Sequence, residues 1–294
     1  MGRLIVNADD FGLTRGVNRA IAELHQMGAL TSATLMAQGG AAEEAIAMAL
    51  ETPSLGVGCH VVLVDGKPVL SPLHDIPNLA DPLSGCFRPS LFKFLRAAHS
   101  NGPWASVSPL DREIEAEAAA QIAQLQAGGL RLTHIDTHKH THMFPAVLRP
   151  VLRAARAAGI CAVRNPFEPA WSRRATPHSS LLRRIQVSLL HRLEPAFRRI
   201  VAEEGFTATD GCIGVLATGS LDAQLIASLV QSLPAGTWEL VTHPGYNDSD
   251  LDQVRTRLRA SREIERQALA AIQTEHGVEL ISFAQLAAEG TPHL

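Results

Sequence analysis

The sequence predicts an α/β protein, and within that class a TIM-like (β/α) barrel. The barrel has seven or eight strands and need not be regular. Apolar, strand-like runs alternate with helical segments seven or eight times along the 294 residues, which is typical of parallel βα units. Polar and ionisable residues follow several of these strands, at the edge where barrel enzymes place their sites. An open doubly wound sheet would also gather strand ends, but it would not normally bring so many positions together.

The first half of the chain contains three predicted strands, and the first of them runs into two acids, Asp9 and Asp10. The predicted elements are a strand over 3–8, a helix over 17–27, a strand over 31–37, a helix over 41–50, a strand over 56–60 and a helix over 111–126. Prolines and glycines interrupt the pattern from 64 to 109, so we predict a long loop there. Loops of this length inside a compact domain are usually functional.

The second half continues the alternation around a histidine-rich strand. The predicted elements are that strand over 134–142, a helix over 145–158, a strand over 160–164, a strand over 212–217, a helix over 221–233, a strand over 238–242, a helix over 258–276 and a strand over 278–282. No repeat of fixed period is visible, which excludes a solenoid. We therefore expect one barrel domain over 1–294.

The segment 166–211 does not fit the alternation. Seven arginines and one acid, Glu194, lie between Arg173 and Arg199, and aliphatic residues recur among them at roughly helical spacing. A basic amphipathic helix can lie on an anionic membrane surface. The alternative is a helical insertion whose apolar face packs on the barrel while its arginines are solvated.

Composition excludes several classes of protein. A net charge of −3 and a pI near 6.5 argue against nucleic acid as a partner. The four cysteines form no C-x-x-C pair, so neither a zinc ribbon nor a disulfide framework is indicated. No signal peptide precedes the first strand and no apolar run is long enough to span a membrane, so we expect a cytoplasmic protein.

The histidine-rich stretch is the strongest functional signal. It places ionisable residues at every second position: His134, Asp136, His138, His140 and His142. In an extended strand these side chains would share one face. Neutral imidazole is the commonest protein ligand of transition metals, and a carboxylate can ligate or orient it. A surface histidine tract with incidental metal affinity is the alternative, but the apolar residues on both sides favour a buried site.

Ionisable residues at the ends of other predicted strands could form a catalytic site together with these histidines. Asp9, Asp10, His60 and His243 all follow strands. One carboxylate and two histidines could hold a divalent metal and leave positions for water and substrate, as catalytic sites do. A second aspartate and a further histidine could then activate water and protonate a leaving group, which suits hydrolysis of an amide or ester.

Four motifs resemble those of the YdjC/ChbG-type carbohydrate deacetylases, in the expected order and across nearly the whole chain. They are Asn7–Leu13, Gly58–His60, His134–Pro145 and Thr242–Tyr246. The resemblance implies a barrel enzyme that removes acetyl from N-acetylglucosamine-type sugars with one divalent cation, Mg²⁺ or Zn²⁺. It also implies residue roles: Asp10, His60 and His138 as metal ligands, Asp9 as base, His243 as acid, and Arg164 as a substrate contact or a residue that orients the ligands. We further expect His140, His142 and Tyr246 to contact substrate, and His134 and Asp136 to orient the ligands.

Shorter segments are similar to the hopanoid-biosynthesis subgroup of that family. They are 62–70, 76–79, 85–88 and 164–169. This resemblance implies a glycosylated hopanoid lipid as substrate, with 166–211 as a membrane-facing lid and contact with the inner membrane surface. Three alternative functions stay open: a deacetylase of soluble chitooligosaccharides, a metal-dependent phosphoesterase, and a non-catalytic sugar- or lipid-binding protein. A homodimer is compatible with each of these functions.

Overall fold

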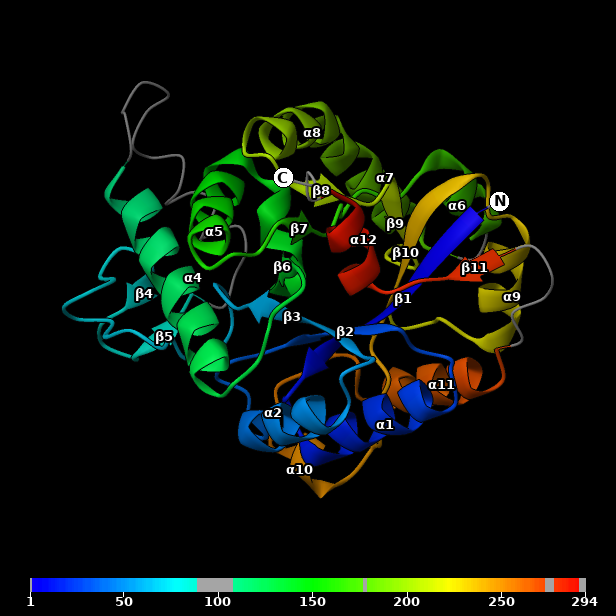
Figure 1. Ribbon diagram of the computed structural model, residues 1–294, viewed down its shortest axis with the longest axis horizontal. Helices are drawn as coiled ribbons and strands as arrows, with labels where there is room; N and C mark the ends of the chain where they lie inside the picture. The colour runs from blue at the N-terminus through cyan, green and yellow to red at the C-terminus, as the bar shows by residue number, and fades with distance from the viewer. Residues whose placement is uncertain (1, 89–107, 177–178, 273–277, 291–294) are drawn as a thin grey trace.

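The computed structural model describes residues 2–88, 108–176, 179–272 and 278–290, and its centre is a nearly closed barrel of parallel strands (Figure 1). The strands follow one another around the barrel in the order β8-β7-β6-β3-β2-β1-β10-β9, and β11 pairs with the start of β1. The strands of the barrel sheet are β1 (Gly2–Phe11), β2 (Ser32–Leu35), β3 (Gly56–Val61), β6 (Ile135–Thr137), β7 (Ala162–Val163), β8 (Thr207–Ala208), β9 (Gly211–Ile213), β10 (Gly236–Thr242) and β11 (Val278–Leu280). The predicted (β/α) barrel is confirmed, in an irregular form.

The two ends of this strand path meet through a single stretch of chain. Residues 209 and 210 alone separate β8, which pairs with β7, from β9, which pairs with β10. The amide of Cys212 also donates to the carbonyl of Phe167, at 3.2 Å. The chain from 207 to 213 therefore acts as one bent strand that closes the barrel.

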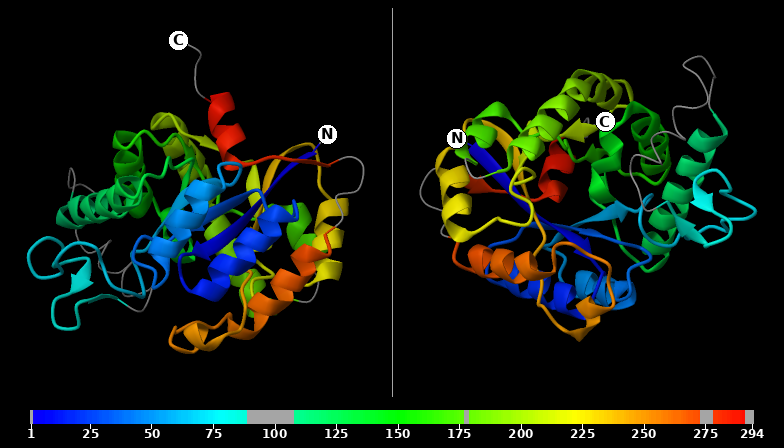
Figure 2. Two further views of the ribbon diagram at one scale, coloured as in Figure 1. Left: turned by 60° about the horizontal axis from the view of Figure 1, so that its bottom comes forward. Right: turned by 180° about the vertical axis from the view of Figure 1, so that it is seen from behind.

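Helices surround the strands on the outside, and one helix blocks an end (Figures 1 and 2). The helices are α1 (Arg15–Gln26), α2 (Ala42–Glu51), α4 (Pro109–Ala127), α5 (Pro145–Ala157), α6 (Ala170–Ala175), α7 (Leu181–Leu190), α8 (Glu194–Glu203), α9 (Ala223–Gln231), α10 (Ser249–Asp252), α11 (Arg259–Ala270) and α12 (Phe283–Gly290), with 3-10 turns η1 (His138–Met143) and η2 (His191–Leu193). Phe283 and Leu286 of α12 are buried with Ile5 and Ala162 at the amino ends of the strands. The opposite end, where the strands finish, stays accessible for a site.

Strand β1 is longer than predicted, and its end is irregular. The register between β1 and β2 shifts between Ala8 and Phe11, and Asp10 has a left-handed backbone with φ of 64°. Neighbouring residues of a regular strand point to opposite faces, whereas a bulge turns one of them aside. The bulge therefore lets Asp9 and Asp10 both face the accessible end of the barrel.

The prediction of a strand through all four histidines 134–142 is wrong after Thr137. The Thr137 hydroxyl accepts the amide N–H of His142 at 3.0 Å and the hydroxyl of Thr141 at 2.9 Å, so the chain turns back on itself. Lys139 and His140 adopt left-handed φ values of 56° and 52° within this 3-10 turn. The histidines consequently point in different directions instead of lining one face.

Two other predicted segments differ in detail. The segment 166–211 is only partly an insertion, because β8 belongs to the barrel and α8 packs against α5; helices α6 and α7 are the additional elements. The predicted loop 64–109 contains a small hairpin, β4 (Ala80–Asp81) with β5 (Cys86–Phe87), while 89–107 lies outside the described residues. Glu113 and Glu117 of α4 hold this loop by accepting backbone N–H groups. Among the described residues, no helix combines the length and apolar character needed to cross a bilayer.

Candidate active site

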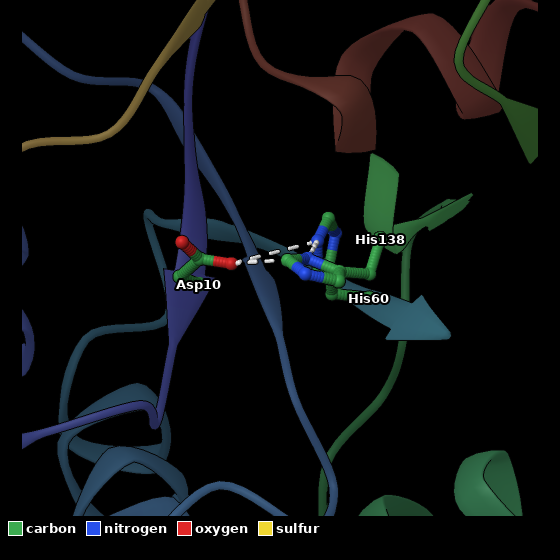
Figure 3. Close-up of side chains that lie close together, drawn as sticks. All are labelled: Asp10, His60 and His138. Atoms are coloured by element: carbon green, nitrogen blue, oxygen red, sulfur yellow. Dashed lines mark hydrogen bonds and ion pairs between the residues drawn. The ribbon is translucent and has the colours of Figure 1, made fainter. Parts of the chain in front are cut away.

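Three of the predicted metal ligands meet at the accessible end of the barrel. Asp10 comes from the bulge of β1, His60 from β3 and His138 from the start of the turn after β6 (Figure 3). Asp10 Oδ1 lies 3.7 Å from His60 Nε2 and 3.6 Å from His138 Nδ1, and the two nitrogens are 3.3 Å apart. Segments far apart in the sequence thus present one oxygen and two nitrogens to a common point.

This donor set fits a divalent cation. Donors about 2.0–2.2 Å from a tetrahedral ion lie roughly 3.3–3.6 Å from each other, close to the observed separations. Asp10 Oδ1 is buried and has no hydrogen-bond partner among the described residues. His60 Nδ1 lies 2.7 Å from Asp136, which can only accept, so Nδ1 donates and Nε2 faces the common point. Asp136 therefore fixes the orientation of the His60 ring.

Asp9 is held in a different way from its neighbour. Arg164 donates from Nη1 to Asp9 Oδ2 at 2.9 Å and from Nη2 to Oδ1 at 2.6 Å, while Asn7 and Thr34 donate to Oδ1. Burial opposes ionisation of this carboxyl group, but Arg164, His60 and His243 together outweigh it and hold the pKa of Asp9 far below its usual range. Asp9 is consequently ionised at every ordinary pH and fixed in position.

Arg164 joins three carboxylates inside the barrel. Besides Asp9, it pairs with Asp136 and with Glu239, to which its Nε donates at 2.8 Å. Arg164 and its partners Asp136 and Glu239 are fully buried. Burial raises the pKa of Glu239 to about 7, even though Arg164 opposes the shift, so one of the three carboxyl groups gains a proton near neutral pH.

His243 lies beside Asp9 at the end of β10. Its Nε2 is 3.7 Å from Asp9 Oδ2, and its Nδ1 is 3.8 Å from Glu265 Oε2. The same Glu265 oxygen accepts the backbone N–H of His243 at 2.6 Å. Burial opposes protonation of the imidazole, but Glu265 and Asp9 outweigh it and raise the pKa of His243. A carboxylate and an imidazole of raised pKa therefore stand next to the predicted metal ligands.

A cavity of about 590 Å³ opens onto these groups. Asp9, Asp10, His60, His138 and His243 line it, together with Lys139, His140 and Arg183. A second cavity of about 820 Å³ adjoins it, since the two share Leu13, Met36, Asp65, Val254 and Arg255 among their walls. The accessible space is therefore an extended cleft with the ionisable groups in one part.

Three of the four residues predicted to contact substrate do not line the cleft. Arg164 and His142 are fully buried, and His142 bonds to Thr137 Oγ1 at 2.8 Å and to the Arg164 carbonyl at 3.2 Å. The ring of Tyr246 lies between two arginines on the outer surface, and its hydroxyl donates to Glu23. His140 alone lines the cleft as predicted.

His134, predicted to orient the metal ligands, lies in the closed end of the barrel. His134 stacks on Phe283 with ring centroids 3.8 Å apart, and its Nδ1 bonds to Thr133. Burial lowers the pKa of His134 to about 3, so the ring is neutral. It fills the closed end of the barrel, away from the metal ligands.

The family model described as YdjC-like protein matches residues 3–278. The chain belongs to the YdjC-like family. It is 33% identical to the carbohydrate deacetylase of Geobacillus stearothermophilus over 96% of each chain. It is 40% identical to the chitooligosaccharide deacetylase of Salmonella paratyphi B over 53% of this chain and 57% of that one.

A solved structure shares the fold of this YdjC-like chain. It is a protein of Enterococcus faecalis V583, provisionally described as a cellobiose-phosphate cleavage protein, with a TM-score of 0.72 and 24% identity. The match covers 97% of this chain and 98% of the other. The likeness supports the barrel architecture.

Three residues of the site were missed at the sequence level. Arg262 of α11 is buried against Asp10, Glu265 of the same helix contacts His243, and Glu239 of β10 contacts Arg164. A signal for Glu239 does exist, because it is a charged residue inside an otherwise apolar strand. Arg262 and Glu265 stand among the other charged residues of α11, Arg259, Glu263 and Arg266, so no pattern in the sequence distinguishes them.

Proposed function

We propose that this protein is a metal-dependent deacetylase that hydrolyses the N-acetyl group of an N-acetylglucosamine-type sugar. The observation that carries the proposal is the adjacency of three groups: an oriented metal-ligand triad, a fixed carboxylate and a histidine whose pKa is raised. Membership in the YdjC-like family and the names of its relatives support the same chemistry. A sugar-binding protein without turnover would need neither Asp9 nor His243 in these positions.

Asp10, His60 and His138 would hold the cation, and Asp136 and Arg262 orient two of these ligands. When bound, a divalent cation polarises a carbonyl and lowers the pKa of water, which makes even a carboxylate of low pKa an adequate base. Asp9 accepts the proton of the attacking water while Arg164 keeps its oxygens in place. His243 donates a proton to the nitrogen as the amide C–N bond breaks. The products are acetate and a free amino sugar.

The finer substrate assignment is the sugar head of a glycosylated hopanoid lipid. The resemblance to the hopanoid-biosynthesis subgroup supports it, and the extended cleft can accept more than one sugar ring. A soluble chitooligosaccharide is the alternative, supported by the name of the Salmonella relative. A phosphoesterase is the remaining enzymatic alternative, and the product released distinguishes it.

Acetate release tests the proposed function. We expect protein loaded with Mg²⁺ or Zn²⁺ to release acetate from chitobiose or from an N-acetylglucosaminyl hopanoid, and a chelator to abolish this release. His138→Ala should lose both bound metal, measured by elemental analysis, and acetate release, because two donors remain where three stood. Phosphate release from sugar phosphates without any acetate release would overturn the proposal. Activity on chitobiose alone would overturn the lipid assignment.

The role of His243 predicts a pH dependence. Its raised pKa favours the protonated imidazole, so kcat of the wild type should fall as pH rises through that raised pKa. His243→Gln should lose about 10²–10⁴-fold in kcat and should no longer show this alkaline fall. An aryl acetamide, whose amine leaves more readily, should recover part of the loss. A variant that keeps the alkaline fall would assign the acid to another residue.

A further inference from the structure

Helix α7 carries its apolar side chains on the outside. None of the ten residues of α7 is buried, and its Leu181, Leu182, Ile185 and Leu189 are 75%, 67%, 48% and 52% exposed. Positions 181, 185 and 189 are four residues apart, and 182 lies seven before 189, so these four side chains form one stripe. An apolar stripe of this kind normally faces a protein core.

The other side of α7 attaches the helix to the barrel through polar contacts. Arg183 donates to the carbonyl of Val215 at 2.7 Å, and Arg184 donates to the carbonyl of Arg173 at 2.8 Å. Arg183, Val187 and Leu190 are less exposed than the stripe. These hydrogen bonds therefore fix helix α7 in the orientation that turns its leucines outward.

The stripe is unusual for this protein. Ten large apolar side chains are strongly exposed among the described residues, and four of them belong to α7 while the others are dispersed. Nothing in the described parts of the chain covers these four. Clustered exposed apolar residues mark interaction surfaces, whereas single ones are common.

Charge identifies the partner of this surface. Arg174 of α6 and Arg192 of η2, on either side of α7 in the chain, are exposed, and neither forms an ion pair with any described residue. Arginines beside an exposed apolar helix face match an anionic lipid bilayer, whose head groups attract the guanidinium groups while the acyl boundary accepts the aliphatic side chains. A protein partner would have to supply both acids and an apolar groove.

We infer that the α7 stripe (Leu181, Leu182, Ile185 and Leu189) docks this protein on anionic membrane surfaces. The inference goes beyond deacetylation, and binding to vesicles does not depend on it. Arg183 of the same helix lines the catalytic cleft, so docking brings the wall of the cleft close to the bilayer. A substrate with its sugar at the head of a lipid would then be presented beside the site.

Cosedimentation of the full chain with lipid vesicles tests this inference. We expect binding to vesicles that contain phosphatidylglycerol, weaker binding to pure phosphatidylcholine, and loss of binding as salt rises. The triple variant Leu181→Gln, Ile185→Gln, Leu189→Gln should bind at least about tenfold more weakly. Arg174→Gln with Arg192→Gln should bind about fivefold more weakly for each arginine removed, and only to the anionic vesicles.

A matched control keeps the test specific. Leu73 and Leu83 are 63% and 98% exposed outside α7, so Leu73→Gln with Leu83→Gln should bind vesicles like the wild type. The α7 triple variant should still release acetate from a soluble N-acetyl sugar, which shows that it folds. Equal vesicle binding by wild type and triple variant would overturn the inference. So would self-association of the wild type, lost in the triple variant, without vesicle binding. Vesicle binding without any acetate release would overturn only the proposed function.

Discussion

Replacing Asp9 by asparagine is expected to lower kcat by about 10²–10⁴-fold while bound metal is retained. Asparagine preserves the shape of the side chain but cannot accept the proton of the attacking water. Both carboxylate oxygens of Asp9 are engaged by Arg164, at 2.6 and 2.9 Å, and neither belongs to the triad of Asp10, His60 and His138. The substitution should therefore remove the base and leave the ligands untouched.

The adjacent residue supplies the control for that experiment. Asp10→Asn should lose both metal and activity, because Asp10 is the one carboxylate of the triad. The two variants differ by one position in the chain, and elemental analysis with steady-state kinetics separates their effects. Near wild-type turnover in a metal-replete Asp9→Asn protein would show that the base lies elsewhere. Loss of metal from the Asp9 variant would instead place Asp9 among the ligands.

The fold could be predicted because long periodic segments dominate it. Strand β1 and helices α1, α4 and α5 each span at least ten residues, so their composition and the residues that end them suffice to indicate them. Strand β8 was missed because two residues carry no periodicity, although they close the barrel. Helix α12 was missed too; it is short and follows the last predicted strand directly.

The residues of the site could be predicted where they belong to a motif. Their roles could not be predicted where these depend on which hydrogen-bond or ion-pair partner each side chain finds in the folded protein. Asp10, His60 and His138 could be named as ligands because the motifs that contain them resemble those of the YdjC/ChbG-type carbohydrate deacetylases. The alternation of histidines indicated an extended strand, but hydrogen bonds accepted by the Thr137 hydroxyl turn the chain after three residues. Whether a polar side chain contacts substrate or a buried charge depends on its partners, which is why the sequence alone did not place Arg164 among three carboxylates.

Replacing Arg164 has the largest expected effect on stability. Arg164 is fully buried and is the ion-pair partner shared by Asp9, Asp136 and Glu239. Replacing Arg164 by methionine leaves these carboxyl groups buried without their counter-ion, which typically costs about 3–5 kcal/mol. Arg153 forms an ion pair with Glu115 in which both side chains are partly exposed, so Arg153→Met should cost at most about 1 kcal/mol.

The pH dependence of unfolding distinguishes a lost counter-ion from a simple packing defect. In the wild type, Arg164 and His60 together outweigh burial and lower the pKa of Asp9 and Asp136, so their contribution is present above the unfolded pKa of about 3.9 and is lost as pH falls. In Arg164→Met, burial and mutual repulsion should raise both pKa values above the unfolded value, which reverses the sign. Urea denaturation of chelated protein should then show a larger gain in stability from pH 7 to about pH 5 in the variant than in the wild type, where Glu239, with a pKa of about 7, is the one carboxyl group of the three that gains a proton in this range. If the variant lost the same free energy of unfolding at all pH values, the effect of Arg164 would be assigned to packing. Only a charge imbalance makes the difference in free energy of unfolding between variant and wild type depend on pH.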